Sequence, residues 1–234
     1  MQTLYIKNIL ICIGAALFFA FTPANDFKTD LLKMQQFYQK NPCFSKQVSV
    51  EVIDATNGKS FSEVVTGQVI RSNNLYYNTF DNKETVVNEK YYLVIDHTAK
   101  RIICDKPNAF AQQDITANYT SMLDTVLKQI KVSFLRNDGS VKWYAFKGTT
   151  NDPFTKAEIG LHKDGYLHSM VYHYPQDEEE PASIIRITYT QVKTNVSFPK
   201  GKFSEKKYIV HNGKTISPAA AYKNYKIINK LLNK

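Results

Sequence analysis

The sequence predicts a mainly β fold with helices (α+β), in which a curved antiparallel sheet forms an incomplete barrel capped by amphipathic helices. Apolar and polar residues alternate over many short runs, beginning with Val48, Val50 and Val52, and turn signals such as Asn57-Gly58 separate the runs. The chain also holds 15 Tyr and 14 Phe against one Trp, a composition that favours pleated, half-buried surfaces. A sheet of about ten such strands twists and curls rather than staying flat.

The overall composition is that of a globular protein. Of 234 residues, 43% are hydrophobic and 22% are charged, and the formal net charge is +9. These values exclude a disordered or low-complexity chain, and the length suits one domain of about 200 residues.

The first 24 residues have the pattern of a secretory signal peptide. Lys7 supplies a positive charge, and the uncharged run from Ile9 to Phe21 is too short to cross a hydrocarbon core of about 30 Å comfortably. Thr22 and Ala24 place small residues at positions −3 and −1 of a cleavage site. We therefore expect residues 1–24 to be removed after Ala24 and the mature chain to reach the periplasm, with an uncleaved N-terminal anchor as the alternative.

An amphipathic helix is expected at the start of the mature chain, over Asp26 to Lys40, because Phe27, Leu31, Met34 and Tyr38 fall on one stripe. Helical spacing returns over Asp114 to Ile130 and over Pro218 to Leu232. Strands are expected over 48–52, 63–71, 75–80, 84–87, 90–95 and 101–104, and then over 131–135, 141–146, 157–161, 166–174 and 182–192.

The chain lacks the usual catalytic signatures. We find no G-x-S-x-G, no H-E-x-x-H, no phosphate-binding glycine loop and no C-x-x-C. His162, His168 and His173 gather around one expected hairpin, but His168 and His173 point to opposite faces of a strand. We expect no enzyme activity, no cofactor and no metal site.

Two cysteines remain after the signal peptide. Cys43 and Cys104 would meet an oxidising compartment, where a bridge between them would close a long loop. The sequence does not give the distance between them. A disulfide and two separately buried thiols both stay open.

Two charged segments stand out. Asp177 to Glu180 reads as a solvated loop tip. Residues 207–234 are expected to form a basic C-terminal extension with a terminal helix, and its lysines either solubilise the chain or favour anionic lipid or an acidic protein surface.

Several segments together resemble a known family. Gly67 to Arg71 leads into Asn74 to Tyr77, Tyr91 to Asp96 (YYLVID) and Lys100 to Cys104, and paired strands over Ala157 to Tyr174 and Ser183 to Val192 follow later. Their order over residues 26–206 resembles that in the periplasmic carriers of outer-membrane lipoproteins, the LolA-like family.

This resemblance implies a half barrel over residues 25–206 whose apolar interior receives acyl chains from an inner-membrane transporter. It also makes Arg71 a candidate lid latch, although Arg71 is displaced from the family's Arg-Pro pair and alternation would turn a displaced arginine to the other face. The cavity lining is expected from the alternating apolar positions. They are Val50, Val52, Val69, Leu75, Tyr77, Leu93, Ile95, Phe134, Trp143, Ile159, Leu161, Met170, Tyr172, Ile185 and Ile187.

The expected function is that of a periplasmic carrier or chaperone that shields acyl chains of a lipoprotein or lipid in a hydrophobic half barrel during transfer toward the outer membrane. Apolar burial would supply the affinity. The expected partners are those acyl chains, an inner-membrane transporter and an outer-membrane acceptor, for a monomer that binds no nucleic acid. The alternative is a non-enzymatic envelope interaction module on the same fold, without acyl cargo.

Overall fold

The computed structural model describes residues 24–61, 63–107, 131–149, 152–178, 181–199, 201–212 and 215–231. Residues 1–23 of the expected signal peptide (1–24) and the helix expected over 114–130 lie outside these residues. The chain divides into two compact units. We call residues 24–37, 53–59 and 131–185 the helix unit, and residues 38–52, 60–107 and 186–231 the tail unit.

Strands dominate both units. They account for 54% of the structure, and α2 (Ala24–Lys40) is the one α-helix within the described residues. The strand order is linear: β14 is an edge strand in the tail unit, and β7 is an edge strand in the helix unit. The strands of neither unit therefore close into a barrel. The expected fold class, mainly β with a helix and an open sheet, is confirmed.

The helix α2 forms where the sequence predicts it. Phe27 and Leu31 are buried one helical turn apart, which marks the stripe that faces the strands. Asp26 in the first turn and Lys40 in the last turn carry the charges that favour each end of a helix. Within the described residues, no helix is both long and apolar enough to cross a membrane.

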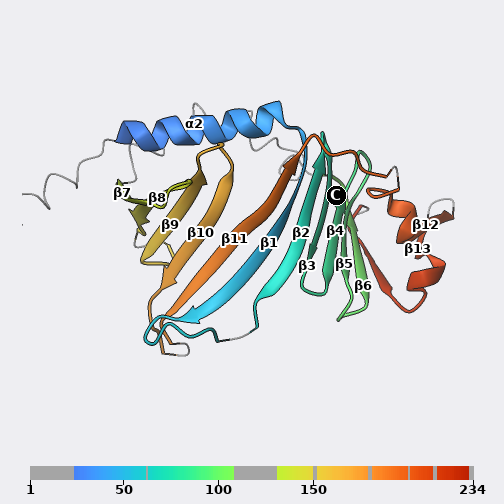
Figure 1. Ribbon diagram of the computed structural model, residues 1–234. Helices are drawn as coiled ribbons and strands as arrows, with labels where there is room; N and C mark the ends of the chain where they lie inside the picture. Colours follow the sequence, from blue (N-terminus) through green and yellow to red (C-terminus); the bar gives the residue numbers. More distant parts are fainter. Residues whose placement is uncertain are drawn as a thin grey trace, which may run out of the picture. The chain divides into compact units, whose positions relative to one another are not determined.

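The helix unit contains four antiparallel strands in the order β7-β8-β9-β10. The side chains of Phe27 and Leu31 pack against Tyr144 and Leu161 on one face of these strands, and Figure 1 shows α2 (blue) beside them. The strands are β7 (Val132–Asn137), β8 (Val141–Lys147), β9 (Lys156–His162) and β10 (Leu167–Tyr174).

A polar contact fixes α2 to these strands. Tyr144 Oη donates a hydrogen bond to Asp30 Oδ2 at 2.5 Å, and Lys142 Nζ lies 3.0 Å from the same oxygen. Burial first, and then the hydrogen bond to Asp30, raise the pKa of Tyr144. The phenol therefore stays a neutral donor to the helix.

The tail unit is a meander of antiparallel strands with one parallel addition. Its strand order is β14-β6-β5-β4-β3-β2-β1-β11, and β14 pairs parallel with β6. Tight turns at Asn73 and Asp81, both with positive φ, join β2 to β3 and β3 to β4. The strands are β1 (Cys43–Asp54), β2 (Val65–Ser72), β3 (Leu75–Phe80), β4 (Lys83–Val87), β5 (Tyr92–Asp96), β6 (Arg101–Asp105), β11 (Ser183–Thr194) and β14 (Lys226–Asn229).

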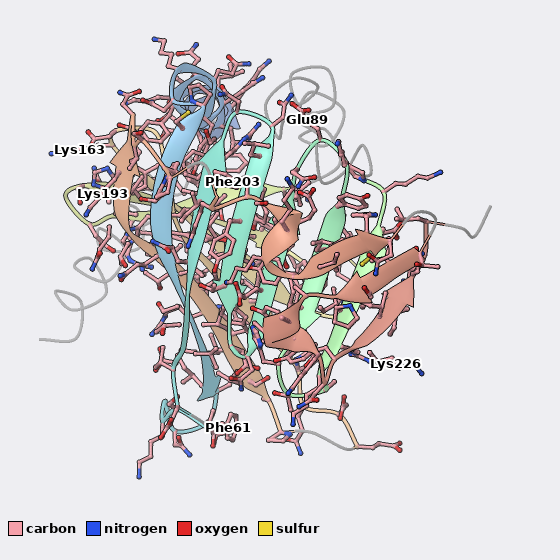
Figure 2. The ribbon with its side chains drawn as sticks, turned by 90° about the vertical axis from the view of Figure 1, so that its right-hand side faces the viewer. Phe61, Glu89, Lys163, Lys193, Phe203 and Lys226 are labelled. Carbon is pink, nitrogen blue, oxygen red and sulfur yellow. The ribbon has the colours of Figure 1, made fainter. Side chains whose placement is uncertain are left out.

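The chain after residue 201, which we call the tail, is built differently from the prediction. It holds the short helices η1 (Glu205–Lys207) and η2 (Ala220–Tyr222), and the hairpin of β12 (Ile209–Asn212) and β13 (Thr215–Pro218). Figure 2 shows these elements beside the strands of the unit, with Phe203 at their start and Lys226 at the beginning of β14.

The terminal helix expected over Pro218 to Leu232 is wrong, because this segment forms η2 and β14. The backbone of β6 offers an unpaired edge, and β14 occupies it with hydrogen bonds that include Lys226 N to Lys100 O and Lys230 N to Cys104 O. Pairing with a sheet edge is a tertiary effect that a helical spacing of apolar residues does not reveal.

Candidate functional site

The strand register sorts the side chains of the tail unit onto two faces. Residues that pair directly across neighbouring strands point to the same side of a sheet. One row of paired residues is Ile70, Tyr77, Val86, Leu93 and Cys104. A second row, offset by one residue, is Lys46, Val69, Asn78, Thr85, Val94 and Ile103.

The face of the first row is a packed core, which we call the covered face. Leu93, Ile95 and Ile102 have 0% exposure. The tail supplies the other side of this cluster. Its contributing residues are Phe203, Tyr208, Ile209, Ala219 and Tyr222.

Four expected cavity residues lie on the covered face: Leu75, Tyr77, Leu93 and Ile95. The prediction grouped them with Val50, Val52 and Val69 in one lining, but the strand register places these four on the opposite face of the sheet. The structure fills the space in front of them with aromatic tail residues, so they form a packed interior in place of an open cavity wall.

A polar network joins the tail to the covered face. Glu84 Oε2 accepts hydrogen bonds from Tyr208 Oη at 2.6 Å, Tyr77 Oη at 2.9 Å and Lys207 Nζ at 3.2 Å. His97 bridges Glu84 Oε1 and Tyr225 Oη, each at 2.9 Å. Burial alone would raise the pKa of Glu84, but the hydrogen bonds from Tyr208, Tyr77 and Lys207 outweigh it and lower this pKa to about 2.

The face of the second row is the candidate site, and we call it the Lys46 face. The expected cavity residues Val50, Val52 and Val69 lie here and are half-buried. Neighbouring strands add further half-buried apolar or aromatic side chains. These are Tyr76, Tyr92, Val94 and Ile103.

Lys46 stands among aromatic rings on this face. Its Nζ lies 3.8 Å from the ring centroid of Tyr189, 5.6 Å from that of Tyr38 and 5.9 Å from that of Phe44. Desolvation lowers the pKa of Lys46 to about 8. No ion pair joins Lys46 to an acid in the described part of the chain.

A second polar group on the Lys46 face lacks a partner. The Oδ1 atom of Asn78 is buried and accepts no hydrogen bond from any described residue. Asn78 pairs with Val69, which pairs with Lys46, so the two polar residues lie two strands apart in one row. Tyr76 lies nearby in the adjacent row of this face, and burial raises its pKa to about 12.

The helix unit holds most of the remaining expected cavity residues. Leu161 is buried, and Phe134 and Ile159 are partly buried against it on the face that carries α2. On β10, Met170 pairs with Ile159 and Tyr172 pairs with Ala157, and both partners lie on β9. Met170 and Tyr172 therefore point to the same face as Ile159.

Three expected cavity residues lie elsewhere. Trp143 lies on the opposite face of the helix unit, with Val141, Val171 and Ile184. Ile185 and Ile187 are half-buried on β11, and alternation turns both away from the side of Ile184.

Arg71, the candidate latch, shares the Lys46 face because it pairs with Phe44 and with Tyr76. Its Nε donates a hydrogen bond to the carbonyl oxygen of Asn73 at 2.9 Å. The register therefore keeps Arg71 on the same side as Val69. A latching role stays a prediction.

Cys43 and Cys104 are free thiols, so the disulfide left open by the sequence does not form. Cys43 lies on β1 and Cys104 on β6, with four strands between them. Strands in a sheet lie about 4.8 Å apart, whereas bridged cysteines have Cα atoms within about 7 Å.

The expected histidine cluster divides among separate contacts. His162 stacks on Tyr166 with ring centroids 4.3 Å apart, and His173 Nε2 lies 3.1 Å from Glu158 Oε1. The described residues contain no group of three or more side chains positioned for a metal. Asp177 and Glu178 are exposed, as expected for a loop tip.

Sequence reasoning missed Lys46 and Asn78 as site residues. The sequence held a signal for Lys46: every second residue from Phe44 to Val52 is apolar except Lys46. A lysine at such a position is either solvated or placed among apolar groups, and only the neighbouring rings decide between the two.

No protein-family model matches the chain, and no curated protein matches it. Among solved structures, an uncharacterized conserved protein from Thermus thermophilus is similar over 88% of this chain and 99% of its own, with 10% identity and a TM-score of 0.50. A LolA superfamily protein from Nitrosomonas europaea is similar over 76% and 97%, with 11% identity and a TM-score of 0.36. Lipoprotein LppX from Mycobacterium tuberculosis is similar over 72% and 96%, with 8% identity and a TM-score of 0.34. The similarity to the Thermus thermophilus protein shows a shared fold and extends no further than the fold.

Proposed function

We propose that this protein is a periplasmic carrier that shields acyl chains of a lipoprotein or lipid during transfer toward the outer membrane. Acyl chains would lie against the Lys46 face of the tail unit and bind through apolar burial. The resemblance over residues 26–206 suggests an inner-membrane transporter as donor and an outer-membrane acceptor. The protein performs this role without covalent chemistry.

One observation carries the proposal: the sheet of the tail unit is apolar on both faces, and the described part of the tail packs against the covered face. The Lys46 face keeps half-buried apolar side chains beside the buried Phe44, Val48 and Val87. The covered face has its aromatic cover and residues at 0% exposure. Val50, Val69 and Val94 on the Lys46 face remain half-buried. Half-buried apolar strands of this kind offer surface to an apolar ligand.

The experiment compares two neighbours on β5 that point to opposite faces. The delipidated protein should bind a fluorescent acyl probe, and Val94→Asp should weaken binding at least about tenfold while the fold survives, because a half-buried wall hydrates a new carboxylate. The measurement is a probe titration, with circular dichroism to verify the fold.

Leu93→Asp is the matched control. Leu93 is completely buried in the covered face, so its charge would stay desolvated and unpaired at a cost of several kcal/mol. This variant should unfold the tail unit. Absence of probe binding in the delipidated wild-type protein would refute the carrier and leave the non-enzymatic interaction module.

A further inference from the structure

We propose that the Lys46 face contains a subsite for the anionic headgroup of an amphiphile, in which a carboxylate or phosphate pairs with the Lys46 ammonium while the acyl chain lies on the neighbouring valines. This inference deepens the proposed carrier function and rests on it. It specifies the class of cargo as anionic amphiphiles, where the fold alone specifies only an apolar surface.

The first step is the environment of the Lys46 ammonium. Rings of Tyr189, Tyr38 and Phe44 lie 3.8, 5.6 and 5.9 Å from Nζ, so apolar groups have replaced much of its water. Aromatic faces attract a cation but carry no net negative charge. A desolvated ammonium without an ion pair therefore favours an anion that enters its surroundings.

The second step is the neighbouring acceptor. Asn78 Oδ1 is buried and receives no hydrogen bond, and buried polar atoms in folded proteins nearly always have a partner. Lys46 and Asn78 are separated by Val69 in the register, which places them roughly 10 Å apart at the strand spacing. A headgroup with an anionic group and a hydroxyl or amine donor would supply both residues with partners.

The third step is the position of the polar pair within the apolar row. Val69 separates Lys46 from Asn78. Val50 and Val52 follow Lys46 along β1 and point to the same face of the sheet. An amphiphile with its headgroup at Lys46 would have apolar contacts on both sides. Polar groups at one point of an apolar surface fix orientation, which is how many ligand sites achieve specificity.

The pH dependence of the subsite follows from the titratable groups that surround Lys46. Tyr38, Tyr76 and Tyr189 are phenols, and Arg71 lies on the same face. The pKa of Tyr76 is raised to about 12 by burial, while that of Lys46 is lowered to about 8 by the same cause. Affinity for an anion should therefore fall as pH rises above about 8.

The experiment compares a carboxylate with its uncharged ester. Delipidated wild-type protein is titrated with cis-parinaric acid and with its methyl ester at pH 7, and the acid should bind at least about tenfold more tightly. Lys46→Met should reduce acid binding to the level at which the same variant binds the ester. Lys46→Arg should keep the preference, and Lys90→Met, at an exposed lysine, should change neither affinity.

A pH series supplies a readout that a general surface charge would not give. The preference of the wild-type protein should decline between about pH 8 and pH 10, whereas an ordinary lysine keeps its charge to about pH 10.4. Equal binding of acid and ester by the wild-type protein overturns the headgroup subsite but leaves the carrier function standing. An acid preference that persists in Lys46→Met also overturns it, and failure of both ligands to bind refutes the carrier function itself.

Discussion

Glu84 shows how one carboxylate holds a whole segment in place. Its side chain is 13% exposed and receives hydrogen bonds from Tyr77 on its own sheet and from Tyr208 and Lys207 in the tail. Because these donors favour the ionised form, the pKa of Glu84 falls from 4.5 to about 2 despite its burial. A folded-state pKa below the unfolded value stabilises the protein at neutral pH and less so in acid.

We expect Glu84→Gln to destabilise the protein by about 2 kcal/mol at pH 7, less than the full shift implies because the carboxylate is partly solvated. This contribution is fully present above about pH 4.5 and is lost as pH falls toward 2, so the difference between variant and wild type should shrink over that interval. Urea unfolding at pH 7, pH 4.5 and pH 2.5 measures it.

Glu89→Gln is the control, because Glu89, labelled in Figure 2, is exposed and is not one of the residues that contact Glu84. It should change stability by less than about 0.5 kcal/mol. A Glu84→Gln difference that stays constant from pH 7 to pH 2.5 would contradict the role given to the ionised carboxylate.

At the scale of elements, the tail belongs to the core of its unit. Ile209 on β12 is 1% exposed inside the cluster that covers Leu93, while the next residue, Val210, is 44% exposed. The basic charge of this region, noted from the sequence, therefore lies on a segment whose apolar residues are already used for packing.

The two neighbours on β12 give a matched test of this role. Ile209→Asp should destabilise the tail unit by several kcal/mol, because it buries an unpaired charge in the aromatic cluster. Val210→Asp should stay within about 0.5 kcal/mol of wild type, because its side chain reaches solvent. Thermal unfolding followed by circular dichroism distinguishes the two, and equal small effects would show that the tail is dispensable for folding.

At the scale of the whole molecule, export is the prediction on which the carrier function depends. The mature protein should begin at Asn25 and appear in the periplasmic fraction, because the apolar run ends at small residues suited to signal-peptide cleavage. N-terminal sequencing after cell fractionation tests this. Retention of residues 1–24 in a membrane fraction would favour an anchored protein.

The fold class and most elements were predictable from the sequence. The helix ending at Lys40 and the strands β2 to β6 and β7 to β11 lie within a few residues of the predicted ranges, because local periodicity and turn residues decide them. The prediction failed at β14, because pairing with the edge of β6 decided the conformation there.

The site was only partly predictable. Alternation shows that Val69 and Ile70 point to opposite faces, but both faces of this sheet are apolar, so periodicity does not indicate which one is filled by other residues. Glu84 and Lys46 acquire their properties from Tyr208 and Tyr189, which are more than 120 residues away in sequence.

The sequence by itself determined the strands, the first helix and which side chains share a face, because backbone conformation and alternation are local properties. Only the tertiary structure decided that the tail covers Leu93 and Ile95 and that Lys46 lies among aromatic rings, with no acid from the described residues paired to it. Both depend on contacts between distant segments, and such contacts are selected by the packing of the whole unit, which sequence spacing does not contain.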